Sequence, residues 1–527
     1  MKPDFRRTMI WLHTYTGLLL GWLLFAVFLT GTLSYFNDEI TQWMQPELAV
    51  QPQNDNIINA SLVALKARGT DVDSWRIDLP DQRSNQWRLQ WQKGKERQAI
   101  YLQGETGEQV TPRETRGGNF FRTFHYALEL RNYGGRYITG VAAMVMLLAV
   151  FSGIFTHRRF FRDFFTLRKK ALLKTLTDFH ALAGIVTIPF CLMICASALI
   201  IYISLYMPWS AQHYLDGGTR ELKKKVTTYL PELKPAQVYR EPITDFTPIA
   251  EQIAKLWPEN PDIRRIRFEQ PFDANGRIIV ERSPKLSLSN KAEILVFSSH
   301  SGQQLAGVPP ERMARKIRRI FYGLHEAHFA QPGLRWLFFI SGLLSCALIA
   351  SGLVIWLYKR LEKVKQRHVG HFIVERLNIA GIAGLVLAVI GYFYANRLLP
   401  VGIEERASLE VAAFLFIWLI SLQHSLFRPA NRAWLEQLSL AALACLFLPL
   451  LDVIQQPQRL VRAVEQQNYV YIGFELSLVL TGLLLFKTVK ALLRKQKRQG
   501  ENPLPGAGRK LKPGIKLNDV GNKPNAV

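Results

Sequence analysis

The chain has 527 residues, and its 66 lysines and arginines outnumber its 41 aspartates and glutamates, giving a formal net charge of +25. A soluble protein of this length would have about three or four domains, but long uncharged apolar runs exclude a purely soluble chain. The basic residues gather beside those runs, so the charge indicates membrane topology and contact with membrane lipid, and we expect no nucleic-acid binding.

The first apolar run, Trp11 to Tyr35, exceeds the roughly 20 residues that cross a hydrocarbon core. A signal peptide has a shorter apolar region, of about 7 to 15 residues, and a small-residue cleavage site, so we expect an anchored helix. The run opens with His13, and Gly17 follows on the same helix face because residues four apart are neighbours. An imidazole that can ligate a metal thus stands beside a position with no side chain, where a flat porphyrin fits.

A polar segment follows, in which apolar and polar residues alternate over Ser74 to Leu79 and Gln86 to Gln92. This alternation predicts half-buried antiparallel strands. A last strand from Ile100 runs into a glycine turn at Gly107, and His125 precedes the second apolar run, which is Tyr137 to Thr156.

The same order of elements then recurs, which indicates an internal duplication. His180 and Gly184 open the third apolar run, Ala181 to Met207, and a second polar segment leads to His325 and the fourth run, Trp336 to Tyr358. The second and fourth runs close with matching dipeptides, which are Ser152-Gly153 and Ser351-Gly352.

Four shorter apolar runs complete the chain, and we assign them no chemistry. They are Ile379 to Ala395, Val411 to Leu426, Gln437 to Leu451 and Tyr469 to Phe486. The basic segments beside the runs belong in the cytoplasm by the positive-inside rule, so an even number of spans leaves both termini cytoplasmic and both polar segments outside.

The predicted fold is a mainly α membrane protein, a polytopic bundle of about eight transmembrane helices with two small α+β external domains. The predicted parts are the first helix (1–36), the first external domain (37–135), the second helix (136–158), a cytoplasmic loop (159–179), the third helix (180–207), the second external domain (208–334), the fourth helix (335–358), a region of about four helices (359–493) and a basic cytoplasmic tail expected to be disordered (494–527).

These elements resemble the PepSY-associated transmembrane family over residues 5 to 362. The resemblance rests on Trp11-x-His13-x-x-x-Gly17, Asp178-x-His180-x-x-x-Gly184, His125, Leu324-His325 and the closing Ser351-Gly352, and the strand with its glycine turn is similar to a PepSY domain. It implies a multi-pass protein of the bacterial inner membrane, in a family that serves iron uptake and includes haem-containing reductases of ferric siderophores.

Topology sorts the four histidines by side. His13 and His180 lie at the cytoplasmic ends of their helices, whereas His125 and His325 lie at the external ends. Because histidine is an axial ligand of haem iron and facing helices of a bundle can hold a cofactor, we predict two b-type haems, each held by one of these pairs.

Other residues bear on the same prediction. Gly17 and Gly184 are expected to make room for the macrocycle, and His157 and His328 are lower-ranked substitutes as ligands. Cationic partners for haem propionates are expected from Arg6, Arg7 and Arg158 inside and from Arg122, Arg136, Arg318 and Arg335 outside.

No glycine-rich loop for NAD or flavin is visible, so electrons are expected from quinol or a cytoplasmic donor. We predict that the protein passes electrons outward to ferric iron in a chelate such as a siderophore, and we assign no catalytic residue. Two alternatives stay open. The first is a non-enzymatic anchored module that binds an envelope protein or peptidase, and the second is a transporter of iron, haem or a siderophore.

Overall fold

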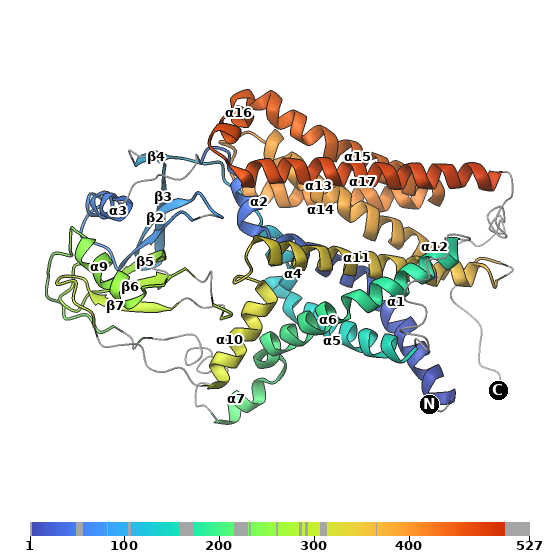
Figure 1. Cartoon of the computed structure of the whole chain (residues 1–527), viewed down its shortest axis with the longest axis horizontal. Helices are drawn as coiled ribbons and strands as arrows, with labels where there is room; N and C mark the ends of the chain where they lie inside the picture. The colour runs from blue at the N-terminus through green and yellow to red at the C-terminus, as the bar shows by residue number, and fades with distance from the viewer. Residues whose placement is uncertain are drawn as a thin grey trace, which may run out of the picture.

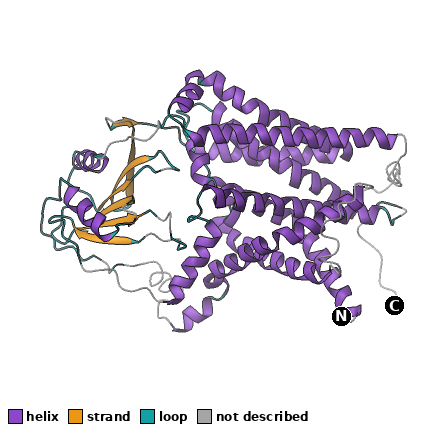
Figure 2. Ribbon diagram, in the orientation of Figure 1, coloured by secondary structure: helices purple, strands orange, loops and turns teal. Residues whose placement is uncertain are grey.

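A computed structural model of the chain describes most of its length, as an array of long helices with a β-sheet at one end (Figures 1 and 2). The described residues are 3–48, 56–81, 83–103, 107–156, 172–214, 230, 233–259, 262–283, 287–289, 293–305, 313–364 and 366–500. Among them are eight helices long and apolar enough to cross a membrane, which confirms the predicted number of spans.

Four of these helices form a bundle. They are α1 (Pro3–Ser34), α5 (Gly135–Thr156), α6 (Leu172–Tyr206) and α11 (Pro332–Leu361), and each contacts two others in the cyclic order α1, α5, α6, α11. The helices approach closely where glycine is present, since Gly21 packs on Leu353 and Gly342 on Thr32. This is the usual packing of membrane helices through small residues.

Two short helices at the end of the bundle nearest the sheet carry the external histidines. The helix α4 (Asn119–Ala127) packs on α1, and α10 (Met313–Glu326) packs on α6. Each ends in a residue with left-handed backbone, at Leu128 (φ 53°) and Ala327 (φ 52°), before the chain turns into the next span. The duplication therefore extends to the turns.

The remaining helices pack beside the bundle. α12 (Val369–Asn378), a π-helical turn η2 (Ile379–Gly384) and α13 (Leu385–Leu398) form one continuous span, and α14 (Arg406–Phe427), α15 (Ala430–Gln455), α16 (Pro457–Glu465) and α17 (Tyr469–Gly500) follow. The indole of Trp22 on α1 donates to Asn378 Oδ1 at 2.9 Å, which ties η2 to the bundle. The helix α17 continues into the basic tail as far as Gly500, and the rest of the tail lies outside the described residues.

The strands of both external segments form one antiparallel sheet of seven strands, in the order β4, β3, β2, β1, β5, β6, β7. They are β1 (Ser74–Asp78), β2 (Trp87–Lys93), β3 (Glu96–Gln103), β4 (Glu108–Val110), β5 (Ile263–Glu269), β6 (Arg277–Arg282) and β7 (Ile294–Ser298). The two modules join where β1 pairs with β5, with Ile77 opposite Ile266.

One face of the sheet is apolar, as the alternating pattern predicts. The helices α3 (Ile57–Lys66) and α9 (Thr247–Leu256) cover this face, and Leu65 and Ile253 pack in the same core as Ile77 and Ile266. The glycine turns after β3 and β7 have positive φ at Gly107 and Gly302, the conformation that glycine adopts without strain.

The sheet is attached to the bundle through ion pairs at the start of α2 (Asn37–Met44). Arg83, from the connection between β1 and β2, pairs with Glu39, and Arg335 at the start of α11 pairs with the same carboxylate. The beginning of α1 and the end of α17 lie at the opposite end of the molecule from the sheet (Figure 1).

Candidate functional site: two pairs of histidines

His13 on α1 and His180 on α6 face each other at the end of the bundle remote from the sheet, with ring centroids 6.2 Å apart. We call them the far-side pair. The His13 Nδ1 lies 2.9 Å from the carbonyl oxygen of Ala149, and the His180 Nδ1 lies 3.0 Å from that of Leu348. A carbonyl only accepts, so each Nδ1 carries the proton and donates it.

The rings of His13 and His180 pack against the glycines of the closing Ser-Gly dipeptides, and we call these glycines the seats of the rings. A Cβ at Gly153 would lie 3.1 Å from Cε1 of His13, and a Cβ at Gly352 would lie 2.9 Å from Cε1 of His180. Ser351 donates to the Leu348 carbonyl and so accepts from His180 Nδ1 at 3.1 Å. The dipeptides that the sequence repeats thus serve histidines on neighbouring helices.

His125 on α4 and His325 on α10 form a second pair near the sheet, with ring centroids 5.9 Å apart. We call them the sheet-side pair. The His125 Nδ1 lies 2.8 Å from the carbonyl of Val27, and the His325 Nδ1 lies 2.8 Å from the hydroxyl of Ser197. Because the Ser197 hydroxyl donates to the carbonyl of Met193, it accepts from His325.

Burial keeps the sheet-side imidazoles neutral. It lowers the pKa of His125, and burial together with the neighbouring His125 lowers the pKa of His325 to about 4. The neutral ring is the form of histidine that binds a metal. With Nδ1 donating, the Nε2 lone pair is the one available to a ligand, and such a hydrogen bond fixes the tautomer of metal-binding histidines.

The spacing within each pair fits two ligands on opposite sides of one metal ion. Bonds of about 2.0 Å from the ion to each nitrogen put the two ring centres roughly 6 Å apart, close to the observed 6.2 and 5.9 Å. Among the described residues, no group of three or more histidine, cysteine, aspartate or glutamate side chains could hold a metal. An ion held by such a pair would need further ligands from outside these side chains.

Gly17 and Gly184 lie one helical turn from the far-side histidines. A Cβ at Gly17 would have no described atom within 4 Å, and one at Gly184 would have only Leu348 Cδ1, at 3.6 Å. The expected role of these two glycines in making room for a macrocycle stays a prediction. The helix α1 also gives the distance between the two pairs along the bundle. Val27, whose carbonyl oxygen accepts from His125, lies roughly 20 Å from His13 along this helix at about 1.5 Å per residue.

Three of the four predicted external arginines gather beside the sheet-side pair. Arg318 lies over the ring of Tyr322, one helical turn before His325, with 5.3 Å to the ring centroid, and Arg136 lies over the ring of Tyr126, next to His125, at 5.2 Å. Arg122 is on α4, one helical turn before His125. We call Arg122, Arg136 and Arg318 the arginine rim.

The prediction that Arg335 is a cationic partner for haem propionates is wrong. Its guanidinium is buried, pairs with Glu39 at 2.8 Å and donates to the carbonyl of Ala330, so it attaches the sheet to the bundle. On the far side, Arg6 donates to the carbonyl of Thr156, and Arg7 is exposed.

Of the two lower-ranked ligand candidates, the structure describes His328 but not His157. His328 binds Glu326 at 3.0 Å, whereas His325 faces His125. His157 and Arg158 lie outside the described residues.

A cluster of buried charges at the sheet-side ends of the C-terminal helices was not predicted from the sequence. Arg397 pairs with Asp452 at 2.6 Å, and both side chains are 1% exposed. The outer charged cluster, as we call it, consists of Glu47, Arg113, Arg397, Arg406, Glu410, Asp452, Arg459 and Glu475. Single charges near the ends of the weaker spans were the only available signal.

Residues 10–359 match the model of the PepSY-associated TM region. This range contains both histidine pairs, the sheet and the four-helix bundle. A comparison with curated proteins gives no match.

Proposed function

The chain belongs to the PepSY-associated TM family, and from this premise we propose that it is a transmembrane electron carrier with two b-type haems. It would reduce ferric iron held in a chelate, such as a siderophore, on the side of the membrane that carries the sheet. The observation that supports the proposal most strongly is the pair of facing imidazoles at each end of the bundle.

Different residues of the chain would bind the haems and contact the propionates or the chelate. The far-side pair and the sheet-side pair would each hold one haem through two imidazole nitrogens, with Nδ1 held by a carbonyl or a hydroxyl. The bound haems would supply one-electron transfer. None of the four cysteines lies in a C-x-x-C-H motif, so attachment would be non-covalent. The arginine rim would hold propionates or attract an anionic chelate.

The number of electrons transferred sets how many ferric ions each donor molecule could reduce. Each ferric ion takes one electron to become ferrous, and quinol gives two electrons and two protons, so one quinol would serve two chelates. A cytoplasmic one-electron donor is the alternative source. Ferrous iron binds more weakly to hard oxygen ligands, so reduction would release it from the chelate for uptake.

We place the protein in the bacterial inner membrane with the sheet in the periplasm. Lys359 and Arg360 lie in the last turn of α11 at the far side and Lys363 follows it, which fits a cytoplasmic location of that end.

Haem content per chain tests the proposal. Purified protein should show a reduced-minus-oxidised spectrum of b-type haem and two haems per chain. The combined alanine substitution of His13, His125, His180 and His325 should remove both. His424→Ala is the matched control, because His424 binds Glu436 and belongs to neither pair.

Absence of b-type absorption in the native protein, or full haem content in the fourfold variant, would contradict the proposal. Uptake of the chelate into liposomes without reductant would instead favour a transporter. A haem-free protein that binds an envelope protein would be a docking module.

A further inference from the structure

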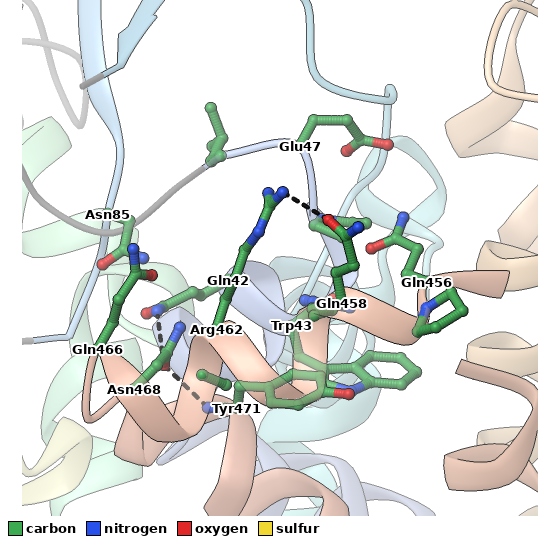
Figure 3. Close-up of a pocket in the computed structure, with 15 residues that line it drawn as sticks. Gln42, Trp43, Glu47, Asn85, Gln456, Gln458, Arg462, Gln466, Asn468 and Tyr471 are labelled. Atoms are coloured by element: carbon green, nitrogen blue, oxygen red, sulfur yellow. Dashed lines mark hydrogen bonds between the residues drawn. The ribbon is translucent and has the colours of Figure 1, made fainter. Parts of the chain in front are cut away.

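A cavity opens at the sheet-side end of the C-terminal helices, away from both histidine pairs (Figure 3). Its volume is about 580 Å³, within the range of sites for small organic ligands. The walls come from α2, the residues that follow it, the β1–β2 connection, α16 and the start of α17.

Side-chain amides dominate the lining, and each amide offers both donors and an acceptor. They belong to Gln42, Asn85, Gln456, Gln458, Gln466 and Asn468. The Gln42 Oε1 is buried and has no hydrogen-bond partner among the described residues. The amide N–H groups can donate to carbonyl, hydroxyl or carboxylate oxygens of a ligand, whereas the Gln42 oxygen needs a donor such as a ligand hydroxyl.

One arginine gives the cavity a positive charge that no carboxylate in the lining offsets. Arg459 is paired with Asp452 and lies 4.4 Å from the centre of the Tyr471 ring, whereas Arg462 is exposed and donates to the neutral amide of Gln458 (Figure 3). Among the described residues of the lining, Glu47 is the one carboxylate, and it is paired with Arg113 at 2.7 Å. An anionic ligand is therefore favoured over a cationic one.

The floor of the cavity connects to the helix that carries His125. Trp43 stacks on Phe474, with centroids 4.4 Å apart, and meets Phe393 at 5.7 Å. Phe393 in turn meets Phe121 of α4 at 5.8 Å, one helical turn before His125. Packed aromatic rings thus link the cavity to the sheet-side pair.

We propose that this cavity docks the substrate as an anionic ferric chelate, held by the amides and by Arg462 above the buried Trp43. The inference rests on the proposed function and deepens it by assigning the chelate a site. The walls from α16 and α17 lie beyond residues 10–359, the part that matches the family, so the C-terminal helices would add a substrate site to the shared electron carrier.

Gallium chelates separate docking from reduction, because Ga³⁺ has the charge of Fe³⁺ but is not reduced. Binding of gallium citrate and of an anionic gallium tris-catecholate to the purified full-length protein is measured by equilibrium dialysis, with a cationic tris-hydroxamate complex for comparison. We expect saturable binding of at least one anionic complex, tighter than that of the cationic one.

Arg462→Glu and Gln466→Trp should each weaken that binding about tenfold, the effect of losing one hydrogen bond to a charged group. Both positions are exposed, so the variants should fold, which their haem content and thermal unfolding check. Arg432→Glu is the matched control, since it makes the same charge change at the other end of α15 and should leave binding unchanged.

Three results would overturn the inference. They are absence of saturable binding, equal affinity in the wild type and both cavity variants, and competition by a quinol analogue, which would make the cavity a quinone site. If Arg318→Glu weakens binding while Arg462→Glu does not, the chelate docks at the arginine rim instead. The haem content of the native protein tests the proposed function separately, because gallium binding does not need haem.

Discussion

In the four-helix bundle the buried polar side chains are mainly small hydroxyls, whereas in the C-terminal helices they are charged. Thr30, Ser152 and Ser345 are typical of the bundle, and their hydroxyls bond to backbone carbonyls one turn earlier. In the C-terminal helices Arg397 with Asp452 and Arg406 with Glu410 are almost completely buried pairs.

The buried polar side chains of the two regions therefore find their partners in different ways. Each of the four paired histidines has its Nδ1 in a hydrogen bond to a carbonyl or hydroxyl, while the charges of the C-terminal helices form ion pairs with one another. An ionisable residue inside a membrane is by default a functional candidate, but internal pairing favours a structural role for most of the outer charged cluster.

Asp452→Ala should have the largest effect on stability. It leaves the Arg397 guanidinium buried without its carboxylate, which typically costs about 3–5 kcal/mol. Thermal and denaturant unfolding of the purified protein in detergent measure this loss. Asp452 also pairs with Arg459, so the triple variant Arg397→Met, Asp452→Leu and Arg459→Met should recover much of it. No recovery would mean that these three residues do more than neutralise one another.

Gly352→Val should have a smaller effect on stability but remove the far-side haem. The added side chain meets the His180 ring, where even a Cβ lies at 2.9 Å, and overpacking of this kind costs about 1–3 kcal/mol. Haem per chain should fall from two to one. The control Gly473→Val, on α17 at a position with no described atom within 4 Å, should keep both haems.

Trp22→Phe tests the contact between the two regions. It removes the hydrogen bond to Asn378, which is worth about 0.5–1.5 kcal/mol. Stability should fall by that amount with haem content unchanged. Trp11→Phe is the control because Trp11 is 60% exposed, and an equal loss there would show that the contact contributes nothing.

Gly17→Leu should change stability least, by less than about 0.5 kcal/mol, because nothing described lies near the added side chain. It should nevertheless exclude the far-side haem by filling the space one turn from His13. The haem content per chain, measured by absorption spectroscopy, tests this prediction, with Gly473→Leu as the matched control. Two haems in the Gly17 variant would show that the macrocycle lies elsewhere.

Much of the fold follows from apolar run length and from the duplication. The eight spans, the antiparallel strands and the glycine turns could all be predicted, because each depends on a local pattern. The pairing of β1 with β5 could not, since strands far apart in the sequence meet there and nothing in either strand specifies its partner.

The histidine positions could be predicted for a similar reason. Helix direction assigns His13 and His180 to one end and His125 and His325 to the other, and the structure brings each pair together. The role of Gly153 and Gly352 as seats depends on contacts between helices, and so does the Arg335–Glu39 pair that contradicts our expectation for Arg335. The cavity depends on three stretches of the chain far apart in the sequence, which are residues 42–48, residue 85 and residues 456–471, and has no local signature.

The seam between β1 and β5 also bears on the ancestry of the molecule. Every histidine pair takes one member from each half of the duplicated chain, and the sheet is continuous only because the two halves contribute neighbouring strands. A gene that encoded a single half would have needed two copies of its product, related by a two-fold axis, to assemble either centre. Fusion of those copies would have turned a symmetric homodimer into one polypeptide whose halves were then free to diverge.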